Sequence, residues 1–147
     1  MKSYLYLICP FVTLVICQII KFTIEVIQTH KYNWSRLFNG SGGMPSSHTT
    51  FSSSVTMLVG YTLGFDHPIF AVSLIFMLIV SYDAMGLRLE SEKQAQAINM
   101  MFEKFEKGKW KTGYQKLKEE LGHQPLEVLV GLLLGTFSAF LFSHLFF

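Results

Sequence analysis

Two histidines lie at the start of apolar runs, each next to a proline. His48 stands in "GGMPSSHTTF" and His123 in "LGHQPLEVLVG". One imidazole can attack phosphorus while a second protonates the leaving oxygen, so the pair is suited to phosphoryl transfer. Pro45 and Pro125 each suit the first turn of a helix, because the fixed φ fits there and the missing N–H would be unpaired anyway. Two such helix starts would present backbone N–H groups, which favour a phosphate.

Charged residues within or beside the apolar runs could hold the phosphoryl oxygens. Lys21 lies inside apolar sequence, where a charge is costly and is a functional candidate. A lysine that snorkels to the headgroups, paired with Glu25 one turn later, is an equal alternative. "YDAMGLR" adds Asp83 and Arg88, which could also form a simple interfacial ion pair.

Zinc is the competing use of two histidines. The sequence has no HExxH pair and no cysteine near either histidine, so a third ligand would have to be Asp83 or Glu127. Glu127 follows His123 by one helical turn and would orient that ring, although an acid in a first turn also favours the helix dipole. We expect no metal and no cofactor, with zinc as the alternative.

Four apolar blocks must position these residues. Half of the 147 residues are hydrophobic and 15% are charged, which is too apolar for a typical soluble domain. A membrane-spanning helix needs about 20 residues, with about 17 as the lower bound, and the two middle blocks reach it only with their polar flanks. The uncharged blocks are Tyr4–Ile20, Thr49–Phe65, Pro68–Tyr82 and Val128–Phe147. We predict an all-α, integral membrane four-helix bundle that forms one domain over residues 1–147, with a helical hairpin at Asp66–Pro68.

Small residues recur every four positions in two of the blocks. After His48 come Ser52, Thr56, Gly60 and Gly64, and after Glu127 come Gly131, Gly135 and Ala139. Such stripes let membrane helices approach closely. If the stripes face each other, His48 and His123 meet at one rim of the bundle, in a pocket shared with Lys21 and Arg88. Packing alone would explain the stripes, but not why a histidine lies at the end of each.

The placement of basic residues predicts the orientation. Ten of the twelve lysines and arginines lie in residues 29–48 and 83–124, so the positive-inside rule puts both loops in the cytoplasm and both termini outside. This clustering indicates a bilayer surface rather than nucleic acid. Within the loop of about 83–124, Ile98, Phe102 and Phe105 predict an amphipathic helix on the membrane. A second short helical segment is expected from Tyr114 to Leu121.

The ordered motifs "GGMPSSH", "DAMGLR", "QAQAIN" and "GHQPLEVLVG" resemble the divergent branch of the type 2 phosphatidic acid phosphatase superfamily, from Lys21 to Gly131. The superfamily includes lipid phosphatases, bacterial acid phosphatases and vanadium haloperoxidases. The resemblance implies a helical bundle and metal-independent hydrolysis through a phosphohistidine. It makes His48 the general acid, His123 the nucleophile and Lys21 a phosphate-binding residue.

The motifs also depart from the parent superfamily. Ser47 stands where that superfamily has glycine, and Glu127 where it has aspartate. Leu117 takes the place of an arginine six positions before the nucleophile, and Arg88 is the candidate replacement. The Arg-Pro pair that should follow the lysine of the first motif is absent.

The sequence therefore predicts a phosphatase that acts on a phosphorylated lipid in the cytoplasmic leaflet. His123, His48 and Glu127 would be catalytic, and the expected phosphate-binding residues are Lys21, Arg88, Ser46, Ser47, Gly43 and Asp83. The alternative is a catalytically silent protein that binds phosphorylated headgroups for transport or scaffolding. The bilayer is an expected partner, nucleic acid is not, and a homo-oligomer is left open.

Overall fold

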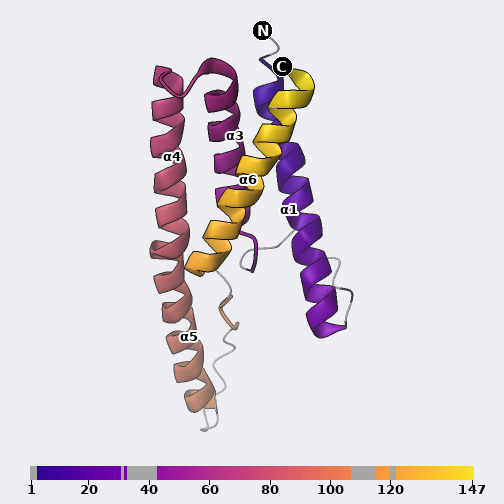
Figure 1. Cartoon of the computed structure of the whole chain (residues 1–147). Coiled ribbons are helices and arrows are strands. Elements are labelled where there is room, and N and C mark those ends of the chain that lie inside the picture. Colours follow the sequence, from indigo (N-terminus) through magenta and orange to yellow (C-terminus); the bar gives the residue numbers. More distant parts are fainter. Residues whose placement is uncertain (1–2, 31, 33–42, 107–114, 120–121) are drawn as a thin grey trace.

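The computed structural model describes residues 3–30, 32, 43–106, 115–119 and 122–147, and every regular element among them is an α-helix. Figure 1 shows α3 at the centre of a bundle, between α4 on one side and α1 and α6 on the other. The helices are α1 (Leu5–Thr29), α3 (Ser47–Leu63), α4 (Pro68–Met85), α5 (Leu87–Glu106) and α6 (Pro125–Phe146). The predicted all-α membrane bundle is confirmed.

Within the described residues, three helices are long and apolar enough to cross a membrane: α1, the run Pro68–Lys104 in which α5 continues α4, and α6. Large apolar side chains cover their outward faces, as a lipid-facing surface requires. Among the exposed residues are Leu7, Phe11, Val15, Val72, Ile75, Phe76, Leu129, Leu133 and Phe137. The protein is a membrane protein, and its outer surface is built for lipid rather than water.

Helix α3 is shorter and richer in hydroxyl side chains than α1, the α4–α5 run and α6. It has 17 residues, so it is about 25 Å long and shorter than a hydrocarbon core of about 30 Å. Most of its hydroxyl groups donate to backbone carbonyls, such as Ser52 Oγ to His48 O at 2.9 Å and Thr56 Oγ1 to Ser73 O of α4 at 3.0 Å, whereas Thr50 Oγ1 is buried with no hydrogen-bond partner. Small hydroxyl side chains let neighbouring helices approach closely, and a bond to a carbonyl satisfies most of those in α3.

The small-residue stripe of α6 packs on α3, as predicted. A Cβ added at Gly131 would lie 2.8 Å from the carbonyl oxygen of Ser46, and one added at Gly135 would lie 2.6 Å from that of Thr50. Real Cβ atoms essentially never come that close to a backbone oxygen, so only glycine fits at these two crossings.

The face of α3 that meets α6 is not the predicted one. It carries Ser46, Thr50 and Ser53, whereas the stripe expected to face α6 turns toward α4. Thr56 reaches α4 through its hydroxyl, and a Cβ at Gly60 would lie 3.1 Å from the Phe70 ring. The prediction was wrong because α3 has small residues on several faces, so a spacing of four does not select one of them.

The helix starts agree with the sequence analysis at two of three prolines. Pro68 begins α4 after the predicted hairpin, and Pro125 begins α6. Pro45 was expected in the first turn of α3, but it precedes the N-cap, which is Ser46. The Ser46 hydroxyl accepts from the Thr49 N–H at 3.4 Å, and a side-chain acceptor of this kind is what a helix N-cap requires.

The amphipathic helix predicted in the polar loop is present as α5, but its direction differs. Figure 1 shows α5 continuing the line of α4 away from the bundle, with only Gly86 between them. The combined run of 37 residues is about 55 Å long, well beyond a hydrocarbon core. The second predicted segment, Tyr114–Leu121, lies partly outside the described residues, and its described residues 115–119 are not helical.

Candidate active site

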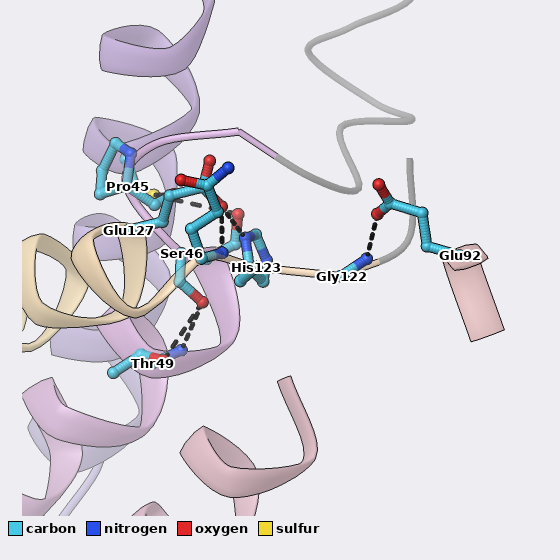
Figure 2. A network of polar contacts seen from close by, with 10 residues as sticks. Pro45, Ser46, Thr49, Glu92, Gly122, His123 and Glu127 are labelled. Carbon is cyan, nitrogen blue, oxygen red and sulfur yellow. Dashed lines mark hydrogen bonds and ion pairs between the residues drawn. The ribbon is translucent and has the colours of Figure 1, made fainter. Parts of the chain in front are cut away.

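The structure brings His48 and His123 together at one end of the bundle. Their ring centroids are 6.3 Å apart, and the ring planes are inclined at 64°. His48 is the second residue of α3, and its side chain is exposed. The starts of the two helices are tied together, because the Ser46 N–H donates to the Glu127 carbonyl at 2.9 Å (Figure 2).

Glu127 holds the His123 ring in a defined orientation. Its Oε2 lies 2.8 Å from His123 Nδ1 and also accepts from the Gln124 N–H at 3.2 Å. Because a carboxylate only accepts, we assign the proton to Nδ1, which leaves a lone pair on Nε2. The one carboxylate thus caps α6 and orients the ring, so the two roles left open for Glu127 are performed together (Figure 2).

His123 is buried, with 2% of its side chain exposed. Burial lowers its pKa below the ordinary histidine value, and the hydrogen bond that the ring donates to Glu127 opposes that change. The positive charges of Lys21 and Arg88 lower the same pKa further, so both cations lie within electrostatic reach of the ring. These effects favour the neutral form of the ring at pH 7.

The backbone next to His123 rests on the junction of α4 and α5. The His123 N–H donates to the Ala84 carbonyl at 3.0 Å, and the Gly122 N–H donates to Glu92 Oε2 at 3.0 Å (Figure 2). A Cβ at Gly122 would lie 2.5 Å from the Leu89 Cα, so only glycine fits. The sequence analysis missed the support from Ala84 because a backbone carbonyl leaves no side-chain signal, and Glu92 is one of several carboxylates in a polar loop.

Lys21 is buried, with 4% of its surface exposed. It lines a cavity of about 340 Å³ together with Glu25, Gly43 and Glu127. A lysine that snorkelled to the headgroups would expose its ammonium group. The burial of Lys21 therefore favours a phosphate-binding role over snorkelling. Gly43 forms part of the same wall, with a φ of 75°, in the left-handed region that favours glycine.

Arg88 and Asp83 form the ion pair that the sequence left open. Arg88 Nε donates to Asp83 Oδ2 at 2.7 Å, and both side chains are partly exposed. The two residues also line a second cavity of about 360 Å³ with His48. The other walls of this cavity are mostly apolar and include Ile79 and Leu87.

The single pocket that we predicted is therefore two cavities. Lys21 lines one with Glu127, and Arg88 lines the other with His48. His123 lines neither cavity, but it bonds to Glu127 of the first and lies beside His48 of the second.

The two serines expected to bind phosphate are placed differently from the cations. Ser46 is fully buried and its hydroxyl caps α3, so it does not face either cavity. Ser47 is 8% exposed, and its hydroxyl lies 3.9 Å from Cys17 Sγ of α1. What this stretch offers is backbone: Ser47 and His48 are the first two residues of α3, whose N–H groups have no partner within the helix.

Zinc finds no ligand set in the part of the chain that the structure describes. No three His, Cys, Asp or Glu side chains gather there in a way that could hold a metal ion. The remaining histidines also lie outside the site: His30 ends α1, His67 caps α4 and His144 is in the last turn of α6.

The fold and the site together define a helical membrane protein with a paired-histidine site at one end of its bundle. The chain belongs to the Divergent PAP2 family, whose model matches residues 3–138. It is 35% identical over 150 positions to a Bacillus subtilis (strain 168) protein described as "Uncharacterized membrane protein YuiD", covering 95% of this chain and 94% of that one. No solved structure matches the chain.

Proposed function

We propose that the protein is a membrane phosphatase that hydrolyses a phosphorylated lipid through a phosphohistidine. The observation that carries this proposal is the arrangement of His123, whose Nδ1 is held by Glu127 and whose ring lies beside that of a second histidine. This is the geometry of a nucleophile, an orienting group and an acid within reach of one another.

The reaction has two steps. In the first, His123 Nε2 attacks phosphorus, the bond from phosphorus to the lipid oxygen breaks, and protonated His48 gives its proton to that oxygen. In the second, a water molecule attacks the phosphohistidine, His48 takes a proton from the water, and phosphate leaves as the P–N bond breaks. Each proton transfer of this kind contributes about 10²–10⁴-fold to the rate.

The start of α3 is the better of the two helix ends for the phosphoryl oxygens. The α6 start is already occupied by the Glu127 carboxylate, which accepts from the Gln124 N–H. The first N–H groups of α3, at Ser47 and His48, lie next to the cavity that Arg88 lines. Arg88 from one side and Lys21 from the other would stabilise the charge that develops on the oxygens.

A lipid fits the cavity beside His48 better than a water-soluble ester does. Besides the charged Asp83 and Arg88, its lining includes the apolar side chains of Ile79, Val80 and Leu87. A phosphate beside Arg88 would leave an acyl chain along the outer, lipid-facing side of α4. The basic residues in the two loops at this end support, by the positive-inside rule, a site at the cytoplasmic leaflet.

A silent phosphate-binding protein is the second candidate. Two observations favour it: Arg88 is engaged with Asp83, and only 2% of the His123 side chain is exposed. In a protein that only binds phosphate, the Arg88–Asp83 ion pair and the burial of His123 would persist when the ligand is bound. In an enzyme, the Arg88 guanidinium would still offer its other N–H groups to phosphate, and substrate would enter between His48 and His123.

Phosphate release by the purified protein separates these candidates. The assay uses a panel of lipid phosphates and a water-soluble phosphate monoester, each with and without chelator. We expect release from the lipid substrates that chelation leaves unchanged, and inhibition by vanadate as a phosphate mimic. Binding of lipid phosphate without release would support the silent binder, and activity lost on chelation and restored by a divalent ion would contradict the mechanism.

A further inference from the structure

The segment that leads into His123 is fastened to α5 along one face of that helix. Figure 1 shows the described part of this segment beside α5. Two buried residues one helical turn apart mark this face of α5, since Ala95 is 6% exposed and Asn99 is 4% exposed. A helix that served only to lie on a membrane would present apolar side chains on this face rather than a buried amide.

Asn99 uses its whole side chain on this segment. Its Oδ1 accepts from the Leu117 N–H at 2.9 Å, and its Nδ2 donates to the Leu117 carbonyl at 2.9 Å. Nδ2 also donates to Glu119 Oε1 at 2.6 Å. One amide thus pairs both backbone groups of Leu117, a residue outside any helix, and these groups would otherwise need other partners.

Two turns closer to the bundle, Glu92 makes the next attachment. Its Oε2 accepts from the Gly122 N–H at 3.0 Å, and Gly122 lies against the Leu89 backbone too closely for any side chain. The next residue is His123, whose N–H donates to Ala84 at the end of α4. Successive bonds therefore run down one helix face to the backbone of the proposed nucleophile.

We propose that Asn99 and Glu92 are positioning residues, which hold Leu117, Glu119 and Gly122 on α5 and so set the place of the His123 ring against His48 and Glu127. This gives the extended α5 a role: it binds the residues that precede His123 and so fixes the position of the His123 backbone. The effect on turnover rests on the proposed function, whereas the placement of the ring does not.

Alanine substitutions on α5 test the proposal, because alanine favours the helix and leaves α5 itself intact. The variants are Asn99→Ala and Glu92→Ala. Their matched controls are Gln94→Ala and Glu90→Ala, which remove an amide and a carboxylate from the exposed side of the same helix. We expect the Leu117 amide in Asn99→Ala and the His123 amide in both test variants to exchange hydrogen faster than in either control.

Two further readouts report on the ring rather than on stability. The ¹⁵N signal of His123 Nδ1, shifted in the parent by its bond to Glu127, should broaden or move in Asn99→Ala. In turnover, kcat should fall about 10–100-fold with KM little changed, because a misplaced nucleophile slows chemistry without removing a binding contact. Asn99→Asp places a carboxylate against Glu119, and the double variant Asn99→Asp/Glu119→Gln should recover part of the loss.

The proposal is overturned if the His123 signal and amide exchange are unchanged in Asn99→Ala, or change equally in the controls. If Asn99→Ala does not fold, Glu92→Ala decides by the same criteria. If no form of the protein turns over any lipid phosphate, the proposed function has failed, and the exchange and ¹⁵N measurements still decide whether α5 positions the ring.

Discussion

Replacing Glu127 with glutamine removes one charge from the site and leaves its shape in place. Glutamine can still accept from His123 Nδ1 and from the Gln124 N–H, and it is the alternative residue at this position of a capping box. The start of α6 should therefore survive Glu127→Gln. What is lost is the negative charge that stabilises the imidazolium character of His123 as it bonds to phosphorus.

The size of the effect follows from the change in this hydrogen bond. A bond to a charged partner contributes about 1.5–3 kcal/mol and a neutral one about 0.5–1.5 kcal/mol. The difference of about 1–1.5 kcal/mol corresponds to a fall in kcat of about 5–13-fold. Glu127→Ala removes the bond and the cap together, so it should cost more in both kcat and stability.

The pH dependence of kcat/KM provides an independent test, because the reasoning predicts the direction in which its acidic limb moves in Glu127→Gln. Only neutral His123 can attack, so the acidic limb of kcat/KM reports the pKa of this histidine in the free protein. The bond and charge of Glu127 raise that pKa against the effect of burial, so Glu127→Gln should lower it further and move the acidic limb to lower pH. The variant would then be slower at pH 7 and yet keep its activity into more acidic solution.

The assay is phosphate release from one lipid phosphate between about pH 4 and 8 in detergent, with circular dichroism as the check on folding. Unchanged kcat together with an unmoved acidic limb in folded Glu127→Gln would refute the reasoning. A limb that moved to higher pH would also refute it, because the carboxylate would then not be the group that stabilises His123 in its charged form.

Three further substitutions probe other parts of the site. His48→Ala should reduce turnover of an alkyl phosphate by about 10²–10⁴-fold but that of nitrophenyl phosphate much less, since nitrophenolate leaves without a proton; equal losses would contradict a general acid. Lys21→Met keeps the buried stem and removes the charge, so both vanadate affinity and turnover should fall, and unchanged affinity would place the phosphate elsewhere. Gly131→Ala puts a Cβ 2.8 Å from the Ser46 carbonyl oxygen and should destabilise the bundle by about 1–3 kcal/mol. Its Tm should be lower than that of the lipid-facing control Leu133→Ala, and equal Tm values would mean that α6 can shift freely on α3.

The helices could be predicted from the sequence because hydrophobic blocks and their proline starts are local signals. Pro68 and Pro125 begin their helices where expected, and the hairpin between α3 and α4 follows from the polar residues before Pro68. Pro45 misled because the serine after it is the better cap. The direction of α5 was also missed, since amphipathic spacing does not distinguish a helix on a membrane from one that continues its predecessor.

At the site, the sequence predicted which residues meet but not how the space between them is divided. The two histidines and Glu127 come together because they occupy the starts of two helices that cross at glycines. The face of α3, the two separate cavities and the mounting of His123 on Ala84 depend on backbone contacts between distant segments. The spacing of residue types along the sequence carries no information about these contacts, so they could not be predicted from it.

Chemical trapping of the phosphohistidine tests the central claim most directly. The wild-type protein is mixed with a lipid whose phosphate is radiolabelled, quenched within milliseconds and digested. We predict acid-labile, base-stable phosphate on the peptide that contains His123, absent from His123→Ala, which should still bind the lipid through Lys21 and Arg88. No trapped phosphate in wild-type protein, with turnover unchanged in His123→Ala, would contradict the account.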